Sequence, residues 1–179
     1  MTPRRLFPLA ALVLLAAAVL LFRPHQEYQV ADLVSALSVA RQQPSKAAFS
    51  VEPVTIDGQT RLAVIAREQT RLTYHVTLPK HAMFRVALAL DPPVWVQPGD
   101  GVLFLIGVSD GRSYQTVTST VLAPYDRPAD RHWHEVAFSL EEYAGLTVDL
   151  ILNTRAGVAG AADVRGDVAV WGAPSVVAR

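Results

Sequence analysis

Apolar and polar residues alternate with a period of two along much of the chain after residue 70. The segment Thr70–Leu78 is the clearest case, because apolar residues occupy every second position. The segment Met83–Leu90 repeats the pattern, and further runs follow at 102–108, 112–121, 136–140, 148–152 and 168–170. A period of two is typical of a β-strand with one buried face, whereas the run 102–108 is apolar on both faces and predicts a central strand. The predicted buried positions include Leu72, Tyr74, Val76, Leu78, Phe84, Val86, Leu88 and Leu90.

Residues typical of turns separate these runs. They include Asp57-Gly58, Pro79-Lys80, Asp91-Pro92-Pro93, Pro98-Gly99-Asp100-Gly101, Asp110-Gly111 and Pro124-Tyr125-Asp126. The Asp-Gly pair between two strand runs favours a hairpin. Many strands at short spacing, with no helical periodicity between them, predict an all-β domain over residues 51–179. We expect an antiparallel β-sandwich of the jelly-roll type.

Residues 24–50 show a different period. Val30, Leu33, Val34 and Leu37 fall at i, i+3, i+4 and i+7, which predicts the apolar face of a short amphipathic helix. Pro44 is expected to end this helix. We interpret the stretch as a juxtamembrane connector. Its helix either packs on the domain or the membrane surface, as such stripes commonly do, or docks on a partner protein beside the membrane.

The N-terminal segment, residues 1–23, has the composition of a membrane anchor. Leu6–Phe22 contains no charged residue, and Arg4, Arg5 and Arg23 flank it. At about 1.5 Å per residue the apolar run spans roughly 26 Å, enough for a thin hydrocarbon core. We predict one transmembrane helix that acts as an uncleaved signal anchor, with a cleavable signal peptide as the alternative. The positive charge before the run predicts a single-pass cell-membrane protein with a cytoplasmic N-terminus and an extracytoplasmic C-terminal domain.

Composition narrows the classes of function. The chain has 179 residues and 51% of them are apolar, which is enough for one folded domain with its own core. Lys+Arg and Asp+Glu both number 16, so no overall positive charge attracts nucleic acid. The chain contains no cysteine, which excludes disulfides, thiolate catalysis and Cys-ligated metal centres.

The stretch Trp133–Pro174 carries a more specific pattern. After the tryptophan come a strand at 136–140, the tripeptide Tyr143-Ala144-Gly145, a strand at 148–152, and the ending Asp167-Val168-Ala169-Val170-Trp171-Gly172-x-Pro174. This order resembles the C-terminal half of galactose-binding-like jelly-roll domains. The resemblance covers the C-terminal quarter of the chain. It implies two adjacent strands joined at Tyr-Ala-Gly, a closing strand that ends at Trp-Gly-x-Pro, and core positions for Trp133 and Trp171. Such domains serve as carbohydrate-binding and accessory modules and occur in bacterial envelope proteins.

A sugar-binding sandwich needs exposed aromatic rings beside polar groups, because apolar sugar faces stack on rings while hydroxyls need hydrogen-bond partners. The candidate rings in expected loops and edges are Trp95, Tyr114 and Tyr125. The candidate polar partners are Asp100, Arg112, Asp126 and Arg127. The alternative is that Trp95 packs under its own loop and that the tyrosines cap the edge of the sandwich.

Metal binding and catalysis have weaker support. His132 and His134 share a strand face at i, i+2 spacing, and a third ligand for a metal would have to come from His75 or His81. Asp57, Asp163 and Asp167 are loose candidates for a structural calcium site, without the dense spacing of a calcium loop. No nucleophile elbow, phosphate loop or zinc-protease motif is present. Glu141 and Glu142 are sequence neighbours that would point apart on an extended chain, so we expect a solvated turn rather than an acid–base pair.

These observations lead to two hypotheses. The first is a membrane-tethered, non-catalytic sandwich without a cofactor that binds a glycan or a glycan-handling envelope partner. The second is a structural accessory subunit that caps a larger membrane complex, docked through Val30, Leu33, Val34 and Leu37. The first hypothesis predicts an exposed aromatic platform, and the second predicts that the apolar stripe is exposed in the isolated chain.

Overall fold

The computed structural model describes residues 26–67, 69–157 and 165–179. The predicted anchor at residues 1–23 lies outside these ranges. No helix within them is long and apolar enough to cross a membrane.

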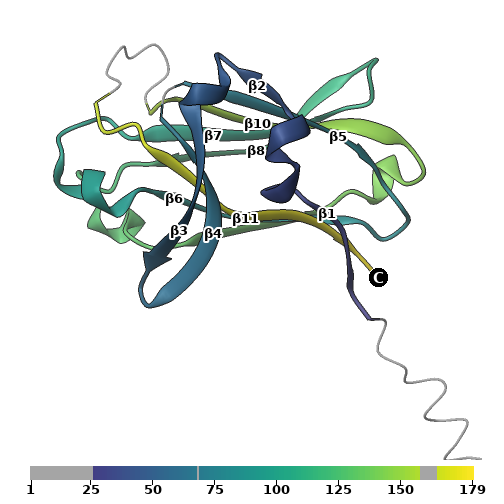
Figure 1. Ribbon diagram of the computed structural model, residues 1–179, viewed down its shortest axis with the longest axis horizontal. Helices are drawn as coiled ribbons and strands as arrows, with labels where there is room; N and C mark the ends of the chain where they lie inside the picture. Colours follow the sequence, from purple (N-terminus) through teal and green to yellow (C-terminus); the bar gives the residue numbers. More distant parts are fainter. Residues whose placement is uncertain (1–25, 68, 158–164) are drawn as a thin grey trace, which may run out of the picture.

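The described chain forms two antiparallel sheets that pack face to face, as Figure 1 shows. The six-stranded sheet has the order β3 (Phe49–Ile56), β4 (Gln59–Ala66), β11 (Ala169–Ala178), β6 (Met83–Leu90) and β9 (His134–Ser139), with β1 (Tyr28–Asp32) also paired to β11. The five-stranded sheet has the order β2 (Arg41–Gln43), β5 (Arg71–Thr77), β10 (Thr147–Ala156), β7 (Val102–Ser109) and β8 (Tyr114–Leu122). The helical elements described are short 3-10 turns: η1 (Ser35–Val39), η2 (Lys46–Ala48), η3 (Pro92–Val96), η4 (Pro128–Asp130) and η5 (Glu141–Tyr143). The predicted all-β antiparallel sandwich is therefore confirmed.

The alternating segments form the inner faces of the two sheets. Every apolar position predicted in β5 and β6 is buried, and Leu72, Phe84 and Leu88 have no exposed surface. Trp171 lies at the centre of the core with no exposed surface, and its ring contacts the edge of Phe104 at a centroid distance of 5.0 Å. The predicted hairpin at Asp110-Gly111 joins β7 to β8. The strand pattern thus comes from burial of one face of each strand.

Within the connector predicted at residues 24–50, the described residues 26–50 are part of the sandwich. The expected amphipathic helix is not formed, because β1 pairs with β11 and only a 3-10 turn follows it. Leu33 and Val34 are 0% and 7% exposed and belong to the domain's own core, while Val30 and Leu37 pack partly against it. The helical spacing reflects a strand followed by a tight turn, which brings the same residues to one side. Two of the four stripe residues are therefore buried in the domain's own core, whereas the accessory-subunit hypothesis expects an exposed stripe.

The Tyr143-Ala144-Gly145 connection also differs from expectation. It joins β9 in the six-stranded sheet to β10 in the five-stranded sheet, so the two strands are not neighbours in one sheet. Gly145 has a φ of 82°, and its N–H donates to the carbonyl of Leu78 at 2.7 Å. The turn therefore crosses between the layers and is held against the end of β5.

The closing strand continues past the Trp-Gly-x-Pro ending to Ala178. Its pairing with β6 shifts register between Gly172 and Ser175, and Ala173 has a φ of 44°. Pro174 sits in this irregularity, where a missing N–H is tolerated. The carbonyl of Pro174 accepts the N–H of Leu33 at 3.0 Å, so the irregularity anchors the turn after β1.

Tyr74 provides a test of the core. Its hydroxyl is buried and has no hydrogen-bond partner among the described residues, and burial together with the nearby charge of Asp32 raises its pKa. A buried polar group without a partner costs roughly 1–3 kcal/mol. We expect Tyr74→Phe to increase the free energy of unfolding by about 1 kcal/mol, measured by urea denaturation. A decrease would show that the hydroxyl is hydrogen-bonded, for instance by a buried water.

Candidate functional site

The loops at one end of the sandwich contain five of the predicted ligand residues. The loop between β6 and β7 carries Trp95 and Asp100, and the loop after β8 carries Tyr125, Asp126 and Arg127. We call this region, at the left of Figure 1, the loop end. Tyr125 is 44% exposed, Asp126 and Arg127 are exposed, and Asp100 is half-buried.

Trp95 is held within its own loop. Its indole N–H donates to the carbonyl of Leu90 at 2.9 Å, and the half-buried ring packs against the core. The Arg131 guanidinium donates to the carbonyl of Trp95 at 3.3 Å and to that of Pro124 at 2.8 Å, which ties the two loops together. This geometry favours the alternative in which Trp95 supports the loop rather than a ligand.

Arg127 is likewise occupied by the loop that carries it. Its guanidinium contacts the Asp130 carboxylate at 2.9 Å and donates to the carbonyl of Val121 at 2.6 Å. The hollow lined by Tyr125, Gly99 and Arg165 has a volume of about 10 Å³. That is room for about one water molecule. Among the described residues, the loop end therefore offers an exposed tyrosine without a hollow for a sugar ring.

The histidine pair does not acquire a third ligand. The His132 and His134 rings stack with centroids 3.9 Å apart, and burial, followed by the charge of His132, lowers the pKa of His134. His75 lies in β5 of the other sheet and His81 at the opposite end of the sandwich. Within the described ranges, no group of three His, Asp or Glu side chains could hold a metal ion.

The calcium candidates do not come together. Asp57 lies in the turn before β4, whereas Asp167 lies close to the far end of that strand, where Ala169 pairs with Ala66. Asp163 lies outside the described residues. The predicted pair Glu141 and Glu142 begins the exposed turn η5, and the Glu141 carboxylate lies 3.5 Å from the His81 ring. This arrangement agrees with the predicted solvated turn.

Tyr114 and Arg112 are placed away from the loop end. Arg112 lies in the exposed β7–β8 hairpin, where the Asp110 carboxylate accepts the N–H groups of Ser113 and Arg112, each at 2.8 Å. These hydrogen bonds hold the pKa of Asp110 below its ordinary value. Tyr114 opens β8 on the outer face of the five-stranded sheet. The predicted ligand set is thus divided between two regions of the domain.

The Tyr114 ring lies across a glycine in the neighbouring strand. A Cβ atom at Gly107 would lie 2.5 Å from the ring, so only glycine leaves room for it there. The Tyr114 side chain is 48% exposed. A flat aromatic ring supported from below by backbone and open above is the geometry that stacks on the apolar face of a sugar.

Polar side chains continue across the sheet from this ring. In register, Tyr114 pairs with Ser109, Ser109 with Asp149, and Asp149 with His75, so the row crosses four strands. The Asp149 carboxylate contacts the His75 ring nitrogen Nδ1 at 3.0 Å, and their side chains are 43% and 76% exposed. The row therefore presents a carboxylate and an imidazole beside an aromatic ring.

A second polar group lies further along the same outer face. Gln43, Arg71 and Asn153 form a row across β2, β5 and β10, and Arg155 lies two residues beyond Asn153. A cavity of about 420 Å³ opens among these side chains. Sequence analysis did not identify Asn153, Arg71 or Arg155. The sequence signal that could have identified this polar group is Asn153-Thr154-Arg155, which interrupts the apolar run at the end of β10.

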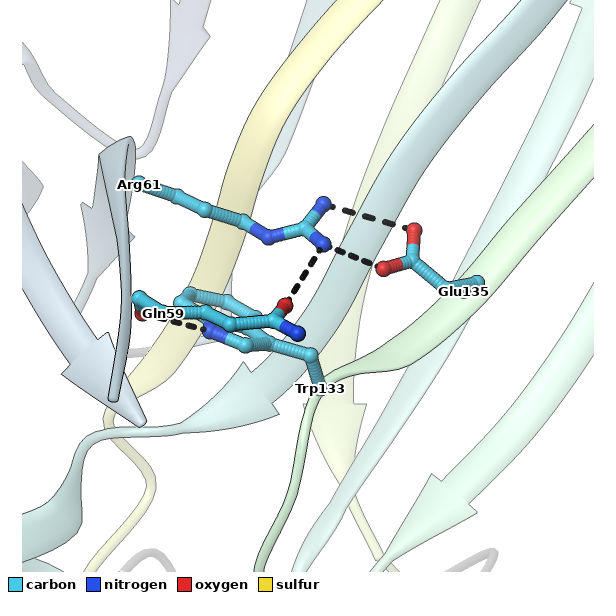
Figure 2. Close-up of polar contacts among 4 residues, drawn as sticks. All are labelled: Gln59, Arg61, Trp133 and Glu135. Atoms are coloured by element: carbon cyan, nitrogen blue, oxygen red, sulfur yellow. Dashed lines mark hydrogen bonds and ion pairs between the residues drawn. The ribbon is translucent and has the colours of Figure 1, made fainter. Parts of the chain in front are cut away.

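Part of the outer face of the six-stranded sheet is covered by Trp133. Trp133 is 7% exposed and packs on Gly172, where a Cβ atom would lie 2.7 Å from its ring. Figure 2 shows that its indole N–H donates to the carbonyl of Gln59 at 3.2 Å and that Arg61 covers the ring, with the guanidinium 5.3 Å from the centroid. Both guanidinium Nη atoms contact the Glu135 carboxylate. The core positions predicted for Trp133 and Trp171 are confirmed.

Comparisons with known proteins agree with the architecture. No family model matches the chain. A protein of Archaeoglobus fulgidus described as uncharacterized is 34% identical over 102 residues, which are 56% of this chain and 25% of that protein. The chain thus matches about a quarter of the length of this relative.

Solved structures of carbohydrate-binding modules share the fold. TmCBM61, solved with beta-1,4-galactotriose, has a TM-score of 0.54 and 11% identity over 85% of this chain and 99% of that one. The CBM51 of Clostridium perfringens GH95, solved with methyl-galactose, has a TM-score of 0.50 and 11% identity over 88% and 97%. A Clostridium perfringens ZmpB structure with an M60 catalytic domain and two CBM51 domains has a TM-score of 0.53 and 16% identity over 88% of this chain and 14% of that one. At these identities the likeness shows a common jelly-roll fold.

Proposed function

We propose that this galactose-binding-like jelly roll is a non-catalytic module that binds a glycan on the outer face of its five-stranded sheet. The observation that carries the proposal is the exposed Tyr114 ring lying across Gly107, in one row with Asp149 and His75. The fold adds support, because TmCBM61 and the CBM51 of Clostridium perfringens GH95, solved with galactotriose and methyl-galactose, have it over nearly their whole length.

The residues of this row would contact different parts of the sugar. The Tyr114 ring stacks on the apolar face of one sugar, and burial of that face supplies the affinity. The Asp149 carboxylate accepts hydrogen bonds from hydroxyl groups, and His75, in contact with Asp149, limits the positions the carboxylate can take. Hydroxyl groups that find these partners fix the orientation of the ring on the platform.

The same row argues for binding rather than hydrolysis. Glycoside hydrolysis ordinarily needs two carboxyl groups on either side of the scissile bond. Asp149 is the one carboxylate among the strand residues of this face, judged by the described registers. A single carboxylate beside an imidazole supports recognition without cleavage.

Two substitutions test the platform. Tyr114→Ala removes the ring, and Gly107→Ala introduces a Cβ that forces the ring aside while leaving the strand intact. We expect each to weaken binding of β-1,4-galacto-oligosaccharides by at least about tenfold in calorimetric titration, which equals about 1.4 kcal/mol. Tyr125→Ala at the loop end is the matched control and should leave affinity unchanged. Loss of binding in the control alone would move the site to the loop end.

We also propose that the module is tethered to the cell membrane by residues 1–23, with the sandwich outside. The proposal rests on the uncharged run Leu6–Phe22 and the arginines before it. Alkaline carbonate extraction of membranes tests it. The full chain should stay in the pellet and a chain starting at residue 26 should not. If expression of the full chain yields a shortened, soluble product, a cleaved signal peptide is favoured.

A further inference from the structure

An arginine-rich corner lies at the end of the five-stranded sheet where β2, β5 and β10 run side by side. Arg71 pairs in register with Gln43 on one side and with Asn153 on the other, so the three side chains share one row of the outer face. Arg155 lies two residues further along β10, and Arg41 two residues from Gln43 along β2. We call these five residues the arginine corner.

An open surface hollow lies at the corner. Its volume is about 420 Å³, and Gln43, Arg71, Asn153 and Arg155 line it. Asn153 is only 7% exposed, and it lies in the wall of the cavity between Arg71 and Arg155. At the floor, the Thr70 and Thr154 hydroxyls bond each other at 2.7 Å, and the Thr154 hydroxyl also accepts the Thr70 N–H at 2.9 Å. The two threonine hydroxyls are thus satisfied by each other, and the arginines and Asn153 belong to the cavity's other polar lining.

The arginines of the corner differ from most others in the domain. Arg61, Arg67, Arg85 and Arg127 each pair with a carboxylate. Arg41, Arg71 and Arg155 pair with no carboxylate among the described residues and are exposed. The whole chain has a formal net charge of zero, so this corner is a local concentration of positive charge on a neutral protein.

Unpaired guanidinium groups around a buried amide fit one kind of ligand group. A guanidinium binds a carboxylate or sulfate through two parallel hydrogen bonds, and an amide can bond the ring hydroxyls beside it. A cavity of this size lies in the range that holds one small ligand or sugar ring. From Tyr114, Asn153 lies two strands across and Arg71 three, each about four residues along, or roughly 16–20 Å away. An oligosaccharide covers this distance and a single sugar does not.

We propose that the arginine corner binds an anionic sugar, carrying a carboxylate or a sulfate ester, in an oligosaccharide that also stacks on Tyr114. The part of the proposal that concerns the oligosaccharide rests on the proposed function. The part that concerns the negative charge of the sugar rests on the arginine corner alone. It assigns the neutral end of the ligand to the aromatic ring and its anionic end to Arg71 and Arg155.

Calorimetric titration of the full-length protein with three matched probes tests the proposal. The probes are tetragalacturonate, its fully methyl-esterified form, and a sulfated galactose tetrasaccharide. We expect one or both anionic probes to bind at least about tenfold more tightly than the neutral ester, with the difference shrinking as salt screens the charge. Preference for the carboxylate or for the sulfate identifies which anion the corner takes.

The variant Arg71→Gln with Arg155→Gln is expected to remove this preference and to leave the thermal unfolding midpoint unchanged, because both side chains are exposed. Arg112→Gln, an exposed arginine on the β7–β8 hairpin, is the matched control and should keep the preference. Equal binding of all three probes, or a preference that survives the double substitution, overturns the anionic site while the proposed function stands. Anion preference that persists in Tyr114→Ala without loss of affinity overturns the platform and keeps the corner. If none of the three probes binds, the anionic site is overturned, and titration with β-1,4-galacto-oligosaccharides decides the proposed function separately.

Discussion

Leu33→Asp is expected to unfold the domain. Leu33 follows β1, has no exposed surface, and donates its N–H to the carbonyl of Pro174 in β11. Replacing a buried leucine by alanine costs roughly 2–5 kcal/mol, and an unpaired buried carboxylate adds several more. Domains of this size have only about 5–15 kcal/mol of stability in total. Circular dichroism of the purified variant should show loss of the β-sheet spectrum or a much lower urea midpoint.

Val39→Asp is the control for this experiment, since it changes the same short segment. Val39 ends η1 and is 85% exposed, so its substitution should leave stability within about 0.5 kcal/mol of the parent. The comparison also bears on the accessory-subunit hypothesis. The burial of Leu33 and Val34 argues against docking through the apolar stripe. If the Leu33→Asp protein stays folded but loses a membrane partner, the docking hypothesis is supported instead.

Trp171→Ala should have the second-largest effect, a loss of about 3–5 kcal/mol in the free energy of unfolding. Trp171 lies between Val64 of β4 and Leu88 of β6 in register, and its ring meets the Phe104 ring of the opposite sheet at 77°. It therefore joins the two layers, and truncation leaves a cavity that the strands cannot close without separating. Urea denaturation with an unchanged m-value would measure the loss.

Trp171→Phe separates the role of the ring from that of the indole N–H. This N–H is buried and has no hydrogen-bond partner among the described residues, so its removal also removes a desolvated polar group. We expect the phenylalanine variant to lose less than half as much free energy of unfolding as the alanine variant. A phenylalanine variant as unstable as the alanine variant would contradict this account and point to an ordered water on the indole.

β5 could be predicted because its residues alternate and only one of its faces is buried. The segment Met83–Leu90 is β6 with the same bounds, although Ala87 and Ala89 on its outer face are buried as well. β4 was missed because Ala63, Val64, Ile65 and Ala66 are all buried. Its outer face is covered by a small apolar cluster with Trp133, so both faces are apolar and the period disappears. Residues 28–32 were misassigned because a short strand followed by a tight turn reproduces helical spacing.

The candidate site was less predictable than the fold. Tyr114 was identified from its residue type, but its support depends on Gly107, and that contact requires the register of β7 and β8. Asn153 and Arg71 are far apart in sequence and become neighbours only through the pairing of β10 with β5. The loop residues Trp95 and Arg127 had a suitable composition for binding, but hydrogen bonds within the loops occupy them. Sequence patterns constrain which face a side chain takes, whereas the partners across strands follow from tertiary structure.

The pairing of Tyr28 with Ala178 brings the first and last described strands together at their outer ends. A domain whose chain enters and leaves at neighbouring points can be inserted into a surface loop of another protein without displacing the flanking chain. It can also be repeated in a series of copies. The loop end and the outer face of the five-stranded sheet would stay accessible in such a fusion.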